Sequence, residues 1–240
     1  MSAVAATVYE DRFDQLNAEF EQSDPSSILA WAAATYGDDL AVVTSFQPTG
    51  IVTLHMLSEI APGTTVITLD TGLLFPETYA LIDELERRLN LRLVRVRPEV
   101  TTEQQAARHG SALWERDPDL CCQIRKVAPL NTALFGYRAW IAGLRRDQSG
   151  RKAVPIVSWD AKYGNVKLSP FATWTERMIW VYLQAHDLPY NALHDRGYPS
   201  IGCNTPACTQ PAATGSNERA GRWTNSSKSE CGIHVLTRRD

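Results

Sequence analysis

Five cysteines are the residues whose type and spacing could do chemistry in this 240-residue chain. Cys121 and Cys122 are adjacent, and Cys203 and Cys208 are separated by four residues. Neighbouring cysteines do not readily bond to each other, because the short ring strains the peptide and the disulfide torsion. Four thiolates can ligate either Zn²⁺ or a 4Fe-4S cluster. A pair of adjacent ligands strains one tetrahedral ion more than a cubane, so we expect the cluster and keep zinc as the alternative.

The fifth cysteine has a different setting. Cys231 lies in "SKSECGIHVLTRRD", flanked by Lys228, His234 and an approach rich in serine and asparagine. Structural cysteines are usually buried among apolar side chains, whereas reactive thiols lie in polar, cationic surroundings. The pattern therefore predicts a reactive thiol on a mobile tail.

Three polar loops follow stretches that have the character of buried strands. They are "TSFQPTG" (44–50), "LDTGLLFPETY" (69–79) and "GLRRDQSGRK" (143–152). The first can offer backbone and hydroxyl donors to an anion at a helix N-terminus, although taken alone it is better explained as a plain strand-to-helix turn. It is not a Walker loop, because the Gly-Lys-Ser/Thr element is missing. The third loop adds cations that could hold phosphate or sulfate: Arg145, Arg146, Arg151 and Lys152.

The elements that must position these loops alternate between strand and helix. Strands are predicted over 40–46, 64–70, 91–97 and 139–144, and helices over 50–61 and 76–90. Repeated strand–helix–strand units predict a parallel sheet flanked by helices. Such sheets bind ligands at the carboxyl ends of their strands, which is where the three loops fall.

Further helices are expected on both sides of this region. Phe13, Leu16 and Phe20 share one helical face of segment 9–20, and a second helix runs from the cap Asp24 to a stop at Gly37. A later helix, capped by Thr173, should bury a stripe of Trp174, Met178, Val181 and Tyr182.

Composition divides the chain and limits its partners. Beyond residue 195 the sequence becomes rich in small and polar residues, so we expect one α/β domain over 1–195 and a cluster-binding segment with a catalytic tail over 196–240. The net charge of −3 gives no sign of a nucleic-acid or membrane partner. The chain has no signal-peptide pattern and no apolar run of about 18 to 20 residues, which predicts a cytoplasmic protein. The number of subunits is left open, a homo-oligomer included.

The motifs together resemble a known family. The segments "SFQPTG", "LDTG…FPETY", "CCQIRKVAPL", "AWIAGLRRDQS", "LPYNALHDRGYPSIGC", "ERAGRW" and "ECGIH" are similar to those of the assimilatory adenylyl-sulfate reductases, over about residues 40 to 234. The resemblance implies an adenine nucleotide α-hydrolase-like fold with a modified pyrophosphate-binding loop. It also implies reduction of adenosine 5′-phosphosulfate to sulfite and AMP, with a separate thioredoxin as electron donor and an S-sulfocysteine intermediate.

The resemblance also implies roles for individual residues. Cys231 matches the nucleophile and Lys126 a lysine between cluster and substrate, while His234 assists as an acid, orients the tail or is structural. The cluster ligands would be Cys121, Cys122, Cys203 and Cys208. The nucleotide pocket would contain Ser45, Gln47, Leu69, Asp70, Thr71 and Gly143, and the phosphosulfate would be held by Arg151, Arg219 and Arg222.

One departure from the family pattern leaves alternatives open. The family usually has a C-x2-C pair where this chain has Cys203 and Cys208 in a C-x4-C pair, so the loop geometry there does not follow from the resemblance. A phosphoadenylyl-sulfate reductase or dual-specificity enzyme is the nearest alternative. A pyrophosphatase-type tRNA thiolase and a non-enzymatic metal-binding module are more remote ones.

Overall fold

The computed structural model describes residues 3–148, 154–213, 218–223 and 231–234, with the side chains described from residue 12 on. Its centre is a six-stranded sheet of order β3-β2-β1-β4-β6-β5. All neighbouring strands are parallel except β5 and β6. The expected parallel sheet is confirmed, with one antiparallel edge strand added. The strands are β1 (Leu40–Val43), β2 (Thr65–Leu69), β3 (Arg92–Val96), β4 (Ala139–Ala142), β5 (Val157–Asp160) and β6 (Asn165–Leu168).

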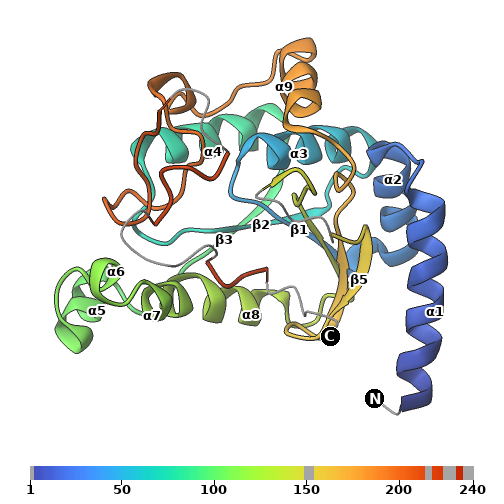
Figure 1. Cartoon of the computed structure of the whole chain (residues 1–240), viewed down its shortest axis with the longest axis horizontal. Helices are drawn as coiled ribbons and strands as arrows, with labels where there is room; N and C mark the ends of the chain where they lie inside the picture. Colours follow the sequence, from blue (N-terminus) through green and yellow to red (C-terminus); the bar gives the residue numbers. More distant parts are fainter. Residues whose placement is uncertain (1–2, 149–153, 214–217, 224–230, 235–240) are drawn as a thin grey trace.

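Helices cover both faces of the sheet. In Figure 1, α3, α4 and α9 lie on one face and α5 to α8 on the other, while α1 runs beside the edge strand β5. In the described part of the chain, no helix has the length and apolar character to cross a membrane. The helices are α1 (Ala3–Phe20), α2 (Pro25–Tyr36), α3 (Pro48–Ile60), α4 (Pro76–Arg88), α5 (Thr102–His109), α6 (Leu113–Arg116), α7 (Pro118–Cys122), α8 (Ala128–Leu134) and α9 (Glu176–Ala185), with short turns η1 (Gly37–Asp39), η2 (Gln123–Val127) and η4 (His194–Arg196).

The helix signals in the sequence are confirmed in the first half of the chain. Prolines stand at the start of α2, α3 and α4, where a missing N–H costs nothing and the fixed φ suits a helix. Asp24 precedes α2 and Gly37 ends it with a φ of 51°. Of the stripe expected on α1, Phe13 and Phe20 are buried. These helices pack on the layer formed by the sheet.

The stripe expected on α9 is wrong in two positions. Met178 and Val181 are 43% and 57% exposed, whereas Ile179 and Leu183 are fully buried. The expected cap is also two residues early, because the hydroxyl of Thr175, and not that of Thr173, accepts from the Met178 N–H. Ile179 and Leu183, four residues apart, therefore form the buried face of α9.

This correction can be measured on one helix. Leu183→Ala should lower the free energy of unfolding by about 2–5 kcal/mol, because it removes a buried side chain and leaves a cavity. Val181→Ala, on the exposed face, should change it by less than about 0.5 kcal/mol. Urea denaturation measures both values. A larger loss of unfolding free energy for Val181→Ala than for Leu183→Ala would contradict the assignment.

Both edges of the sheet are held by side chains. At the β5 edge, the Asn17 amide of α1 accepts from the Ile156 and Val157 N–H groups at 2.8 and 2.9 Å and donates to the Val157 carbonyl at 2.8 Å. At the β3 edge, Arg95 pairs with Asp83 and Glu86 of α4 at 2.6 and 2.5 Å. These contacts fix α1 and α4 against the sheet.

Candidate active site

A pocket lies at the carboxyl ends of β1, β2 and β4, where the parallel sheet was expected to bind a ligand. Its wall includes Ser45 and Gln47 from the loop after β1, Leu69 at the end of β2 with Thr71 beyond it, and Gly143 after β4. The Gln47 side chain accepts from the Ile201 N–H at 3.1 Å, so the loop after β1 is tied to the C-terminal segment. Five of the six residues predicted for the nucleotide pocket therefore line one space.

The loop after β1 is shaped by two local constraints. Phe46 has a φ of 55° and a buried ring, and its N–H donates to the Thr44 hydroxyl at 3.0 Å. A Cβ on Gly50 would lie 2.2 Å from that hydroxyl oxygen, so only glycine fits there. The turn brings the loop backbone and the first turn of α3 to the pocket, an arrangement suited to anions.

Asp70, the sixth predicted residue, is not in the pocket wall in the described part of the chain. Its carboxylate accepts from the Tyr79 hydroxyl at 2.6 Å, from the Arg97 guanidinium at 2.9 Å and from the Gly72 N–H at 3.1 Å. Burial alone would raise the pKa of Asp70, but these donors outweigh it and the pKa is lowered. The structure places Asp70 in the support of the loop after β2.

The segment with the adjacent cysteines is one continuous helical run. Helix α7 ends at Cys122, and η2 continues it as a turn of π-helix into α8. The buried Arg125 of this turn donates to the Thr71 carbonyl at 2.7 Å and to the Gln105 side chain at 3.1 Å. These bonds fasten the cysteine helix to the loop after β2, so that Lys126 reaches the pocket wall.

The four cysteines expected to be ligands are buried on two segments that meet. The backbone of Cys203 forms an isolated antiparallel β-bridge with Leu74, and its sulfur lies 3.4 Å from the Thr71 hydroxyl oxygen. Burial, with the neighbouring charges of Cys122 and Cys203, raises the pKa of Cys121 to about 11. Hydrogen bonding between Cys203 and Cys208 lowers the pKa of the first and raises that of the second. Within the described ranges, no group of three or more His, Cys, Asp or Glu side chains is arranged to hold a metal ion.

Cys231 also lines the pocket, and its segment rests on the turn between β5 and β6. Lys162 donates to the Gly232 carbonyl, and the Tyr163 hydroxyl donates to the Ile233 carbonyl at 3.4 Å. The His234 ring stacks on the Trp140 ring, with centroids 5.6 Å apart and planes 7° apart. The approach to Cys231 that was expected to be mobile, residues 224–230, lies outside the described residues.

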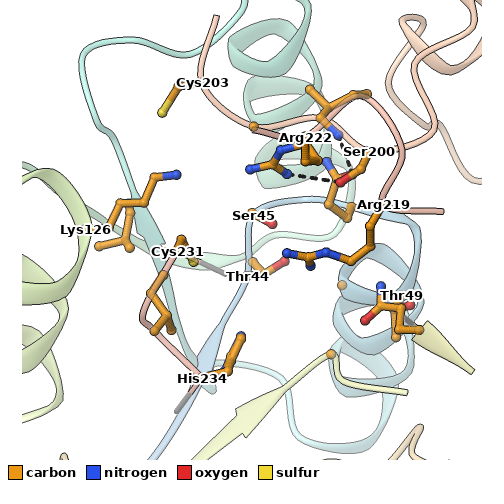
Figure 2. Close-up of a pocket in the computed structure, with 18 of the residues that line it drawn as sticks. Thr44, Ser45, Thr49, Lys126, Ser200, Cys203, Arg219, Arg222, Cys231 and His234 are labelled. Atoms are coloured by element: carbon orange, nitrogen blue, oxygen red, sulfur yellow. Dashed lines mark hydrogen bonds between the residues drawn. The ribbon is translucent and has the colours of Figure 1, made fainter. Parts of the chain in front are cut away.

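Cations from two segments, η2 and residues 218–223, share the pocket with Cys231. Figure 2 shows Lys126, Arg219 and Arg222 arranged around the space that the thiol also borders. Arg222 donates to the Cys208 carbonyl at 2.8 Å and to the Ser200 hydroxyl at 3.0 Å. Burial alone would lower the pKa of Lys126, but negative charge on the nearby cysteines raises it, so the ammonium stays charged.

The other predicted cations are placed differently. Arg145 is fully buried and bonded to carboxylates, and Arg146 pairs with Glu21 at 2.5 Å. Arg151 and Lys152 lie outside the described residues. The roles assigned to individual substrate-binding residues stay predictions.

Several pocket residues were missed at the level of the sequence. The wall also contains Gln148, Ser200, Gly202, Glu218 and Trp223, to which no role had been assigned, together with Thr49 from the predicted anion-binding loop 44–50. A Cβ on Gly202 would lie 2.4 Å from the Arg222 guanidinium, so a larger residue there would displace that side chain from its present position. These residues fall in segments that the sequence had singled out without assigning them a role: the polar loop 143–152, the motif that ends in Cys203 and the sequence around Arg219 and Arg222.

Comparison with known proteins identifies the family. The family model described as phosphoadenosine phosphosulfate reductase domain matches residues 39–211. A relative named adenosine 5′-phosphosulfate reductase from Salinibacter ruber is 51% identical over 93% of this chain and 89% of its own. One named phosphoadenosine 5′-phosphosulfate reductase from Gloeobacter violaceus is 46% identical over 92% of this chain and 93% of its own.

A solved structure agrees with these relatives. The phosphoadenylyl-sulfate reductase of Candida auris, crystallised as a phosphate complex, superposes with a TM-score of 0.73 at 31% identity, over 80% of this chain and 94% of that one. FMN adenylyltransferase of Candida glabrata, at 17% identity and a TM-score of 0.55, shares the fold alone. With its sheet, its pocket and these relatives, the chain belongs to the phosphoadenosine phosphosulfate reductase family.

Proposed function

We propose that this chain reduces adenosine 5′-phosphosulfate to sulfite and AMP, with Cys231 as the nucleophile. The observation that carries the proposal is the meeting of Cys231 with Lys126, Arg219 and Arg222 in the pocket at the strand ends. A thiol among cations, beside a loop suited to phosphate, is an arrangement that can attack the sulfur atom of an anionic phosphosulfate. The Salinibacter ruber relative, named for this substrate, supports the choice.

The nucleotide is held by two sets of groups in this proposal. The loop of Ser45 and Gln47 with the N-terminus of α3, together with Leu69, Thr71 and Gly143, receives the adenosine and its phosphate. Arg219 and Arg222 take the phosphosulfate, because guanidinium groups can bind its oxygens in pairs. Arg151 is assigned to the same task by the resemblance alone.

The first chemical step transfers the sulfonate to the protein. The Cys231 thiolate attacks the sulfur atom in line, the bond from sulfur to the bridging phosphate oxygen breaks, and AMP leaves with that electron pair. A bond between Cys231 sulfur and the sulfonate forms, which makes an S-sulfocysteine. Lys126 and the arginines reduce the repulsion between the thiolate and the anionic substrate.

The second step consumes two electrons from a separate thioredoxin. One thioredoxin thiolate attacks the Cys231 sulfur and expels sulfite, leaving a mixed disulfide. The other thioredoxin thiolate then closes its own disulfide and releases Cys231. Because this cycle needs reduced thiols, we assign the reaction to the cytoplasm.

The residues also fit a 4Fe-4S cluster. Cys121, Cys122, Cys203 and Cys208 are four buried thiols whose charges interact. The buried indole N–H of Trp114, which packs against Cys203 and Cys208, has no acceptor among the described residues and could donate to a cluster sulfide. These four cysteines would hold the cluster. When bound, it would supply negative charge that orients Lys126 and a covalent tie between the two segments.

Anaerobic turnover with two substrates tests this function. The purified chain, supplied with thioredoxin and a thiol source, should release sulfite and AMP from adenosine 5′-phosphosulfate. The form with a 3′-phosphate should react at least about tenfold more slowly, measured as kcat/KM. The reverse preference would establish the phosphoadenylyl-sulfate alternative, for which the Gloeobacter violaceus and Candida auris proteins are named. No sulfite from either substrate would overturn the reductase assignment.

A further inference from the structure

Arg145 is a buried cation that the proposed reaction does not use. Its side chain is 1% exposed. Its Nε donates to Asp147 at 3.0 Å, its Nη1 to the Thr49 hydroxyl at 2.5 Å, and its Nη2 to Glu218 at 2.5 Å. A guanidinium that leaves water must find charged or polar acceptors, and here each of its nitrogens has one. Arg145 is therefore committed to the protein and is not available to the substrate.

The acceptors of Arg145 come from separate parts of the pocket. Thr49 lies in the first turn of α3, beyond the loop after β1, and Glu218 directly precedes Arg219. The second carboxylate oxygen of Asp147 accepts from the Glu176 N–H, at the start of α9, at 2.6 Å. Arg145 thus joins the first turn of α3, the start of α9 and the segment that carries the substrate arginines.

Among the described residues of the pocket wall, Glu218 is an acidic residue that lies with the cations Lys126, Arg219 and Arg222. Its two carboxylate oxygens accept from Arg145 and, at 2.9 Å, from the Gln148 side chain. The Arg145 charge neutralises it, so that its carboxylate does not repel an anionic ligand. One residue further on, the Arg219 guanidinium lies 5.6 Å from the centre of the Trp223 ring. Arg219 is thus held at its backbone by the neighbouring Glu218 and at its guanidinium by Trp223.

We propose that Arg145 and Glu218 form a positioning pair that holds Arg219 toward the anionic end of the nucleotide. Arg145 acts through Glu218 and does not touch the ligand. The identity of the natural ligand rests on the proposed function, whereas the coupling of the pair to Arg219 can be measured by binding alone.

Nucleotide binding to the full chain tests the pair. In calorimetric titrations, Glu218→Gln keeps the size of the side chain and removes its charge. Affinity for ADP, which has two linked anionic groups, should fall roughly tenfold, while affinity for adenosine should change by less than about twofold. A general loosening of the pocket would weaken the binding of ADP and of adenosine alike. That result would contradict the proposal.

A double-mutant cycle then asks whether the pair works through Arg219. The variants are Glu218→Gln, Arg219→Met and the two combined, again with ADP. If Glu218 acts by placing Arg219, the combined variant should bind ADP no more weakly than Arg219→Met, within about twofold. Losses that multiply would show independent roles and would overturn the proposal.

The neighbouring arginine supplies a matched control. Arg145→Lys keeps the charge but loses the fork of donors, and should reproduce the selective loss of ADP affinity. Arg146→Lys, which alters the pair with Glu21, should bind ADP like the wild type; a loss as large as that of Arg145→Lys would count against the assignment. If the wild type binds ADP but releases no sulfite, the reductase proposal fails and this test still stands.

Discussion

Cys231→Ser is expected to abolish sulfite release, with a loss of at least about 10³-fold in kcat. Serine keeps the size of the side chain, but its hydroxyl is a far weaker nucleophile than a thiolate. Rapid quench with labelled adenosine 5′-phosphosulfate should show sulfonate bound to the wild type and none bound to the variant. Because Cys231 is not assigned to the cluster, the iron content and the AMP affinity of the variant should equal those of the wild type.

The matched control for this variant is Cys203→Ser, which alters an assigned ligand and leaves the nucleophile in place. It should lower the iron content and the visible absorbance of the anaerobically purified protein. If Cys231→Ser released sulfite at more than a few per cent of the wild-type rate, Cys231 would not be the nucleophile. A Cys203→Ser variant with unchanged iron would remove the cluster assignment and leave the nucleophile assignment untouched.

Lys126→Met should produce the second large loss, about 10²- to 10³-fold in kcat/KM. The lysine lines the pocket, and its positive charge is maintained by the cysteines around it. Methionine fills similar space without the charge, so the thiolate would approach the substrate against greater repulsion. Steady-state sulfite assays give the value.

A second lysine near Cys231 provides the comparison. Lys162 donates to the Gly232 carbonyl from the exposed turn between β5 and β6. Lys162→Met removes a charge from the same neighbourhood but from outside the pocket wall, and should cost less than about tenfold in kcat/KM. Equal losses in the two variants would mean that general electrostatics, and not the placement of Lys126, controls the rate.

The sequence predicted the parts of the fold that rest on local patterns. The strands at β1 to β4 and the helices α2 to α4 follow from apolar runs, prolines and a terminal glycine, and they are confirmed within a few residues at their ends. The predicted strand ends were placed too late, because they ran past Val43 and Leu69 into the polar loops that follow. The family resemblance is confirmed by relatives up to 51% identical.

What the sequence did not reveal depends on contacts between distant segments. The short hairpin of β5 and β6 was not predicted, although its turn contains Gly164, and its place beside β4 depends on contacts with a distant segment. The sequence does not show that Arg145 is buried in an ion pair, because its partner Glu218 lies more than seventy residues away along the chain. The face of α9 that is buried depends on its packing against the rest of the core, and the choice between Met178 with Val181 and Ile179 with Leu183 is not fixed by a periodic pattern alone.

The contacts at the two edges of the sheet have a consequence for association between copies of the chain. An open edge strand offers unpaired N–H and carbonyl groups to which another chain can add a strand, and this is a route to aggregation. Asn17 occupies such groups at the start of β5, and Arg95 places a charged, ion-paired side chain on β3. Side chains at both edges thus oppose the addition of a strand from another copy. The protein should therefore resist aggregation through its sheet edges at high concentration.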